Sequence, residues 1–303
     1  MTTLTLRLDD LAHGGDAVGH HEGQAVFVPL GIPGETVRVA LEEQRGTYAR
    51  GRLLEVLEPA ASRVAPPCPY FGLCGGCQWQ HIAYEAQLEH KRRIVADLLA
   101  RLGGQPDAPV RPALGMDDPW AYRNHVQLKM DRQGRIGYYA LKSHAVVPVE
   151  QCLITHPLVD ELWDALEIEL EDLDGIGLRA GAATGEQMVI LEGHPGDLPE
   201  LEVDFPVACV YLAGESLAVL AGDSHIHEAL LGRRFRLSAP SFFQVNTAQA
   251  ERLAEAVRTY LDLQPDEALL DAYCGVGTFA LLLADAAGSV LGIESSPWAI
   301  EDA

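Results

Sequence analysis

Alternating apolar and polar positions dominate the first 60 residues of the chain. Residues 3–8, 24–28, 36–41 and 50–57 alternate at period two, which is the spacing of a strand with one buried face. A Gly14-Gly15 turn and a Gly-Ile-Pro-Gly loop separate these runs. The pattern predicts five short strands, four of them at these runs, and so many strands in so short a span favour a small OB-like β-barrel.

Helical periodicity replaces alternation in two later segments. The first helix is expected at 82–102, ends at Gly103-Gly104, and should bury an apolar stripe made of Ile94, Val95, Leu98, Leu99 and Leu102. The second is expected at 247–262, with Asn246 as its N-cap. Its buried stripe should consist of Leu253, Val257, Tyr260 and Leu261.

The remaining pattern predicts a mixture of helices and strands. Residues 110–240 contain many short strand-like runs, and one of them, 122–129, places Arg123, His125, Gln127 and Lys129 on one face. Near the end, a buried strand at 267–272 leads through a glycine-rich turn into a helix at 279–287 and a second strand at 289–293. This order is the start of a βαβ unit.

Composition places the chain among globular proteins of a reducing compartment. It has 303 residues, 48% of them hydrophobic and 22% charged, and six cysteines. No charged segment followed by an apolar core opens the sequence, and the apolar run at 279–284 is too short to span a bilayer. We therefore expect a cytoplasmic protein of two or three domains, monomeric and without a membrane partner.

The charge is divided unevenly along the chain. The formal net charge is −22, yet residues 1–150 hold 16 Lys+Arg against 17 Asp+Glu, and residues 151–303 hold 6 against 27. RNA binding through the first half is therefore compatible with an acidic protein. The candidate contacts are Arg38, Arg45, Arg50 and Arg52 in the barrel, Lys91, Arg92 and Arg93 on the first helix, and the 122–129 face. Taken singly, each barrel arginine is more typical of ordinary surface charge, and a basic run on a helix is usually a solvated face. The 122–129 face is equally consistent with exposure to solvent.

Three cysteines lie in a ligand-like cluster. Cys68, Cys74 and Cys77 have the spacing C-x5-C-x2-C, with glycines between them that allow a tight fold. Three thiolates leave a tetrahedral metal or a cubane cluster one ligand short, and Cys152, in another proline-flanked turn, is the best candidate for the fourth. The spacing favours an iron–sulfur site over zinc, because zinc ribbons bring two C-x2-C pairs, and over disulfides.

The turn at 273–278 has the features of a nucleotide site. Gly275 and Gly277 allow a ligand to approach the backbone closely, and Glu294 ends the next strand, where a carboxylate can bind both ribose hydroxyls. By spacing alone a dinucleotide site fits equally well. Cys274 in the turn and Cys209 are interpreted as structural cysteines.

Several of these segments resemble one family. The run Cys68–Cys77 followed by Gln80-His81, the later Val147-Pro148-Val149…Cys152 and the string Ser-Phe-Phe-Gln-Val-Asn at 241–246 are similar to the RumA/TrmA family of RNA uracil-5-methyltransferases, 23S rRNA type. The resemblance implies a TRAM domain at the barrel and a 4Fe-4S cluster on Cys68, Cys74, Cys77 and Cys152. It also implies S-adenosyl-L-methionine bound by Gln244, Tyr273, Thr278 and Glu294.

The resemblance implies methylation of C5 of a uridine in structured RNA, most simply 23S rRNA. In the family a cysteine thiolate adds to C6 of uracil, C5 attacks the methyl group, and a base removes the C5 proton. The nucleophile and base of the family have no match up to Ala303 and are expected beyond it, so the chain is expected to be C-terminally truncated and inactive alone. The rival hypothesis is a non-catalytic RNA-binding iron–sulfur protein derived from such an enzyme.

The predicted architecture is a multidomain α/β protein. Residues 1–59 form the OB-like TRAM barrel, and residues 60–240 form a central mixed α/β domain that carries the iron–sulfur site and faces RNA. Residues 241–303 form the start of a Rossmann-like class I methyltransferase domain.

Overall fold

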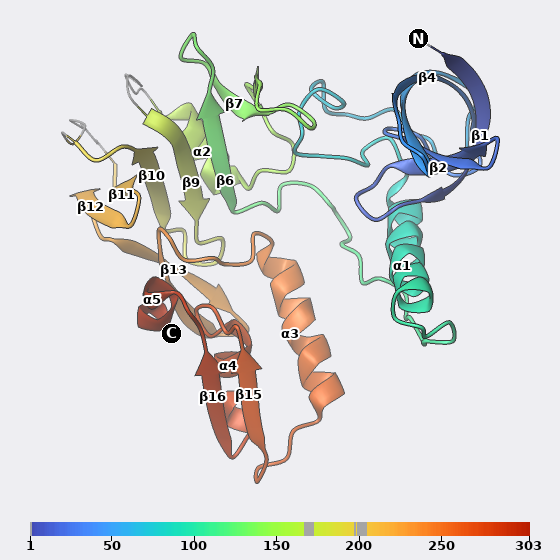
Figure 1. Cartoon of the computed structure of the whole chain (residues 1–303). Coiled ribbons are helices and arrows are strands. Elements are labelled where there is room, and N and C mark those ends of the chain that lie inside the picture. The colour runs from blue at the N-terminus through green and yellow to red at the C-terminus, as the bar shows by residue number, and fades with distance from the viewer. Residues whose placement is uncertain (1, 167–172, 197, 199–204) are drawn as a thin grey trace. The chain divides into compact units, whose positions relative to one another are not determined.

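The computed structural model describes residues 2–166, 173–196, 198 and 205–303. The chain divides into two compact units (Figure 1). The first consists of residues 1–117 and 139–144, and the second of residues 118–138 and 145–303. Each unit is described separately.

The first unit is built on a closed five-stranded barrel. Its strands are β1 (Thr3–Leu11), β2 (Ala17–His21), β3 (Gln24–Val28), β4 (Thr36–Gln44) and β5 (Tyr48–Glu58), hydrogen-bonded in the order β1-β2-β3-β5-β4. β4 also pairs with β1 and closes the barrel, and only the β3–β5 pair is parallel. Inward positions of the alternating runs, such as Leu8, Val28 and Val39, are fully buried. The predicted barrel is confirmed.

Helix α1 (Tyr84–Arg101) packs against this barrel. Ile94 and Ala86 are partly buried against the barrel core, and the helix has no fully buried residue. The predicted helix is therefore correct, but its predicted buried stripe is wrong in part, since only Ile94 and Leu98 of its five residues are half-buried. Val95, Leu99 and Leu102 are exposed, because α1 meets the barrel with the face that carries Ile94.

Residues 139–144 complete the first unit from a distant part of the chain. Gly75 N donates to Tyr139 O at 2.9 Å, and Leu141 N donates to Leu73 O at 3.1 Å. Lys142 Nζ lies 2.8 Å from Asp16 Oδ2, on the loop between β1 and β2. This short stretch thus contacts both the loop of residues 68–77, called the cysteine loop below, and the barrel.

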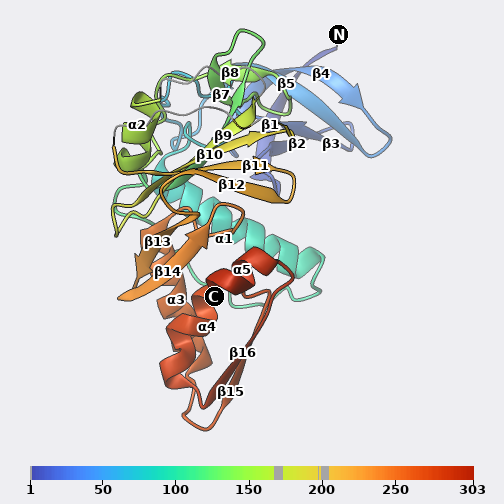
Figure 2. The same ribbon diagram turned by 90° about the vertical axis from the view of Figure 1, so that its left-hand side faces the viewer.

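A seven-stranded sheet forms the centre of the second unit, in the order β12-β11-β10-β9-β6-β7-β8 (Figure 2). Its strands are β6 (His125–Met130), β7 (Ile136–Tyr139), β8 (Val146–Pro148), β9 (Leu173–Ala180), β10 (Gln187–Gly193), β11 (Ala208–Ala213) and β12 (Ser216–Ala221). Helix α2 (Pro157–Asp164) covers one face through Val159 and Leu162. The mixed α/β character predicted for 110–240 is confirmed.

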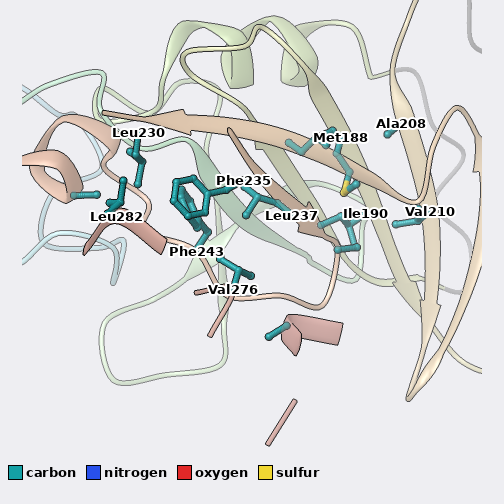
Figure 3. Packing of buried hydrophobic residues seen from close by; sticks show 14 of the residues in the cluster. Met188, Ile190, Ala208, Val210, Leu230, Phe235, Leu237, Phe243, Val276 and Leu282 are labelled. Carbon is teal, nitrogen blue, oxygen red and sulfur yellow. The ribbon is translucent and has the colours of Figure 1, made fainter. Parts of the chain in front are cut away.

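The other face of this sheet contributes to a second hydrophobic core (Figure 3). Met188, Ile190 and Val210 from the sheet are clustered with residues of the hairpin β13 (His225–Leu230) and β14 (Arg233–Ser238). Phe243, Val276 and Leu282 belong to the same cluster, so the core joins the sheet to the end of the chain.

The last elements are α3 (Thr247–Leu261), β15 (Ala268–Ala272), α4 (Thr278–Leu283), the 3₁₀ turn η1 (Ala284–Ala286), β16 (Ser289–Ile293) and α5 (Pro297–Asp302). β15 and β16 are parallel, as the predicted βαβ start requires. Asn246 caps α3 as expected, because its side chain accepts a hydrogen bond from Gln249 N. The predicted stripe on α3 is wrong.

Helix α3 packs against the core through small residues and not through the predicted stripe of large ones. Ala250 and Ala254 are buried against the hairpin and α4, whereas Leu253, Tyr260 and Leu261 are exposed. Alanines allow a close approach between elements, so they and not the large side chains face the core. In the part of the chain that the structure describes, no helix has the length and apolar character needed to cross a membrane.

Candidate cofactor site

The turn between β15 and α4 is held in an unusual backbone conformation. Tyr273, Gly275 and Gly277 have φ angles of 66°, 56° and 76°, all in the left-handed region that favours glycine. A Cβ at Gly277 would lie 3.2 Å from Leu281 Cδ1. Tyr273 is not glycine and adopts this strained conformation with 91% of its surface exposed.

Glu294 fixes this turn from the end of β16. Its Oε2 accepts a hydrogen bond from Gly275 N at 2.9 Å, and its Oε1 accepts from Ser295 N at 2.6 Å and Ser296 N at 2.8 Å. The N–H groups of Ser296 and Gly275 hold the pKa of the Glu294 carboxyl below its usual range. An ionised carboxylate therefore lies directly beside the glycine turn, as the sequence predicted.

Asp271 connects the turn to the helix that follows it. Its Oδ2 accepts a hydrogen bond from Ala280 N at 2.9 Å, and this satisfies one of the first N–H groups of α4. Thr278 is the first residue of α4 and is half-buried. Tyr273, Thr278 and Glu294 thus lie on the turn itself, at the start of the helix that follows it and at the end of the neighbouring strand.

Gln244 lies on a different segment, residues 238–247, which packs into the same hydrophobic core as the turn. Ser241 and Phe243 are buried, while Phe242 is 70% exposed and Gln244 is half-buried. Phe243 packs in the same hydrophobic cluster as Val276, the middle residue of the turn (Figure 3). The segment that carries Gln244 and the turn that carries Tyr273 are therefore anchored in one core.

The cysteine loop contains thiols that could bind a metal, but they are not grouped around one point as metal ligands are. None of the six cysteines, all in the described part of the chain, forms a disulfide. Cys74 Sγ accepts a hydrogen bond from Gly76 N at 3.4 Å. Within residues 2–166, 173–196, 198 and 205–303, however, no three His, Cys, Asp or Glu side chains are grouped as ligands for one metal ion. The expected convergence of Cys68, Cys74 and Cys77 is not present among them, and Cys152 belongs to the second unit.

Cys274 and Cys209 are buried, as predicted for structural cysteines. Burial raises the pKa of both thiols, to about 11 for Cys209. Asp271 and Glu294 raise the pKa of Cys274 further. Neither sulfur is in an environment that favours a reactive thiolate.

The predicted cationic contacts are largely paired with carboxylates. The arginines of the barrel form ion pairs at 2.7–3.2 Å: Arg38 with Glu55, Arg45 with Glu43, Arg50 with Asp16 and Arg52 with Glu42. Lys129 pairs with Glu192 at 2.8 Å. The barrel pairs are largely exposed, whereas the Lys129–Glu192 pair is half-buried. Water and salt weaken exposed pairs, so in the barrel a phosphate can replace the carboxylate partner.

Among the described residues, the basic run Lys91, Arg92 and Arg93 on α1 has fewer carboxylate partners than the barrel arginines. Arg92 pairs with Glu89 at 3.0 Å, while Lys91 and Arg93 are exposed. His125, predicted on the polar face of its strand, is instead half-buried, and its Nδ1 lies 3.1 Å from Arg179 Nη2. The polar face of 122–129 is thus only partly presented to solvent.

The barrel and the glycine turn together define an α/β protein with a TRAM domain. Residues 2–54 match the TRAM domain family. The chain is 34% identical to an uncharacterized RNA methyltransferase of Halalkalibacterium halodurans, over 99% of this chain and 73% of that protein. It is 35% identical to one of Thermosynechococcus vestitus, over 99% and 74%. The chain therefore belongs to the RNA methyltransferase family.

A solved structure shares the fold. The Pyrococcus abyssi tRNA (uracil-54, C5)-methyltransferase in complex with S-adenosyl-L-homocysteine matches with a TM-score of 0.74 and 23% identity. The match covers 98% of this chain and 74% of that chain.

The expectation about residues beyond Ala303 stays a prediction. Ala303 is the C-cap of α5, and its backbone N donates to Ala299 O at 3.0 Å. Neither this cap nor the match to the relatives tests whether a nucleophile and a base follow in a longer chain. The expected truncation and the expected inactivity of residues 1–303 stay predictions as well.

Sequence reasoning missed two residues that support this site. Asn124 and Arg179 are buried polar side chains of the central sheet, and both hydrogen-bond to the segment around Gln244. In the sequence, Asn124 is one polar residue of the run 122–129, and nothing in that run distinguishes it from its neighbours. Arg179 lies beside Ala180 in an apolar strand, where an arginine signals a specific buried partner.

Proposed function

We propose that this protein transfers the methyl group of S-adenosyl-L-methionine to C5 of a uridine in structured RNA. The observation that carries the proposal is the Glu294 carboxylate beside Gly275, at the carboxyl ends of β15 and β16. Ligands of open α/β sheets bind at this edge, and a carboxylate there accepts hydrogen bonds from ribose hydroxyls. Gln244, Tyr273 and Thr278 would complete the contacts to the cofactor.

Family membership supports the RNA substrate, and the shared fold supports uracil as the base. The TRAM domain at residues 2–54 lies in the half of the chain that is nearly neutral. We propose 23S rRNA as the substrate, because the barrel and the cysteine loop occur together in this chain. A uridine within structured RNA must leave its stack to reach a methyl donor.

In this reaction the residues of the chain bind and orient the cofactor. The cofactor supplies the methyl group, and Glu294 fixes the position of the adenosine ribose. No cysteine among residues 1–303 is assigned as the nucleophile that adds to C6, since Cys209 and Cys274 are buried with raised pKa values. We propose that the nucleophile and the base lie beyond Ala303 in a longer protein. Transfer of methyl groups to RNA by residues 1–303 alone would contradict this.

We also propose that Cys68, Cys74, Cys77 and Cys152 bind a 4Fe-4S cluster. These four cysteines form no disulfide, so each keeps a thiol that can bind iron, and Cys74 Sγ accepts a hydrogen bond from Gly76 N, as cluster sulfurs do. No step of the methyl transfer passes through the cluster. Iron and sulfide analysis of anaerobically purified protein tests this. Colourless protein with one equivalent of zinc would contradict it.

The function is tested in two measurements. Titration calorimetry with S-adenosyl-L-homocysteine should show binding to the chain. Methyl transfer to 23S rRNA and to tRNA is then measured with the product of the complete reading frame, and the nucleosides are analysed by mass spectrometry. We expect 5-methyluridine in 23S rRNA. RNA binding without binding of the cofactor analogue would favour a non-catalytic RNA-binding protein, and a methyl group on another base would overturn the reaction proposed.

A further inference from the structure

Two buried side chains of the central sheet hold the segment that carries Gln244. This segment runs from the end of β14 to the start of α3 and covers residues 238–247. Its backbone forms no strand or helix between Ala239 and Asn246, so other groups must satisfy its carbonyls. Asn124, just before β6, and Arg179, on β9, supply the donors.

Asn124 contacts the segment at three points. Its Nδ2 donates to Gln244 O at 3.3 Å and to Thr247 Oγ1 at 3.1 Å, and its backbone N donates to Val245 O at 2.9 Å. The backbone O of Asn124 accepts from Ala180 N at 2.8 Å, so the residue is itself fixed to β9. With 4% of its surface exposed, Asn124 has no room to move away.

Arg179 holds the beginning of the same segment. Its Nη1 donates to Ser238 O at 2.9 Å, and its Nη2 donates to Ser241 O at 2.8 Å. Burial lowers the pKa of Arg179 to about 10, so the guanidinium is still charged at neutral pH. Asp302 fixes the two serines from the other side through Ser238 N and Ser241 Oγ.

The side chain of Thr247 extends the network to a second buried group. Thr247 Oγ1 donates to Glu228 Oε2 at 2.9 Å, and Glu228 also accepts hydrogen bonds from Ala182 N and Ala183 N. Gln244 therefore lies between two ends of its segment that are each hydrogen-bonded to buried polar groups. Hydrophobic packing of Phe243 alone would bury the segment without fixing the position of each backbone atom.

We propose that Asn124 is a positioning residue for cofactor binding, which acts through the backbone of Gln244 and with the support of Thr247 and Arg179. The inference rests on the proposed function, because it takes Gln244 as a cofactor contact. It predicts that the affinity for the cofactor depends on hydrogen bonds made by the central sheet, while the affinity for RNA does not.

The principal variant is Asn124→Ala, studied in the whole chain. The Kd for S-adenosyl-L-homocysteine should rise about tenfold, because the loss of one positioning interaction of this kind is worth about one factor of ten. The Kd for a 23S rRNA fragment should stay the same. Hydrogen exchange of the peptide 239–247 should become faster. The matched control is Gln187→Ala, which removes a hydrogen bond from the side-chain amide of Gln187, on β10 of the same sheet, to Leu158 O on α2 and should change neither Kd.

A second pair of variants covers the case in which Asn124→Ala does not fold. Thr247→Val removes the oxygen that accepts from Asn124, and Thr247→Ser keeps it. Thr247→Val should weaken cofactor binding severalfold, and Thr247→Ser should restore it. Because Thr247→Val also removes the hydrogen bond to Glu228, an unchanged Kd for the RNA fragment is the control against a general loss of stability.

The outcomes separate the two proposals. If the wild-type chain binds the cofactor analogue and the folded Asn124 and Thr247 variants bind it equally well, the positioning role is overturned and the function remains. If the wild-type chain does not bind the analogue, the proposed function fails and the positioning role fails with it. An equal loss of RNA and cofactor affinity would also overturn the positioning role.

Discussion

Glu294 accepts hydrogen bonds from backbone N–H groups with both of its carboxylate oxygens. Substitution by Gln removes the charge but keeps one acceptor oxygen, so the turn should persist. We expect the Kd for S-adenosyl-L-homocysteine to rise about tenfold, since hydrogen bonds to a charged acceptor are stronger than those to a neutral one. Titration calorimetry measures the change.

The matched control for this substitution is Glu301→Gln. Glu301 is an exposed carboxylate on α5 that pairs with Arg236 at 3.0 Å. Its substitution should leave the affinity for the analogue unchanged. Equal affinity of Glu294→Gln and the wild type would remove Glu294 from the site.

His125 makes stability depend on pH. Burial, with Arg179 second, lowers the pKa of His125 to about 3, far below its unfolded value of about 6.5. Between these two values the unfolded chain binds a proton while the folded chain does not. The contribution of His125 to stability is fully present above pH ~6.5 and is lost as the pH falls toward ~3, at up to about 1.4 kcal/mol per pH unit.

Substitution by Asn tests this, because the Asn oxygen can take the place of Nδ1 as acceptor for Arg179. We expect the melting temperature of His125→Asn to fall less steeply than that of the wild type between pH 6.5 and pH 4. His81, whose pKa is lowered to about 4 mainly by burial, remains in both proteins. Parallel curves would mean that His125 is protonated in the folded protein.

Among whole elements, the repeat of apolar positions and the N-cap residue Asn246 were sufficient to locate the barrel, α1 and α3 in the sequence. The face with which each helix packs against its neighbours could not be predicted. The stripe at Leu253, Tyr260 and Leu261 has helical spacing, but α3 packs through Ala250 and Ala254, which spacing alone does not rank above larger residues. Glu294 was found at the turn because strand order fixes its place. Asn124 and Arg179 were missed because their partners are backbone carbonyls more than 50 residues away in the sequence.

Helix α1 provides a test of RNA binding at the same scale. Replacing Lys91, Arg92 and Arg93 by alanine removes three cations from one helix. The affinity for single-stranded RNA should fall, and the plot of log K against log salt should become shallower by about 0.7 for each phosphate that the helix no longer neutralises. Filter binding at several salt concentrations measures both.

Arg101→Ala is the control on the same helix. Arg101 is an exposed arginine that pairs with Asp97 at 3.0 Å. Its substitution should change the slope little. If the triple variant keeps the slope and affinity of the wild type, Lys91 and Arg93 are ordinary surface cations, and the barrel arginines become the next candidates.

For the whole molecule, the two-stranded sheet β15–β16 determines behaviour in solution. Leu270 and Leu291 are register partners, so they lie on one face, and both are exposed together with Ile293. In the described residues these strands pair only with each other. An exposed apolar face beside open strand edges favours self-association.

We therefore expect the chain to sediment as larger species when its concentration is raised. The double variant Leu270→Gln, Leu291→Gln should shift the distribution toward the monomer. The control Val219→Gln, on an exposed position of β12, should leave it unchanged. Monomeric wild-type protein at all concentrations would contradict the prediction.

Residues 139–144 have a consequence for the order of folding. They belong to the first unit, although the strands β7 and β8 on either side of them belong largely to the second. Residue 141 must therefore leave the ribosome before the cysteine loop can form its hydrogen bonds with Tyr139 and Leu141. By then all of β6 and β7 has also emerged. The chain passes between the units three times, so no single protease cut divides it into two intact units.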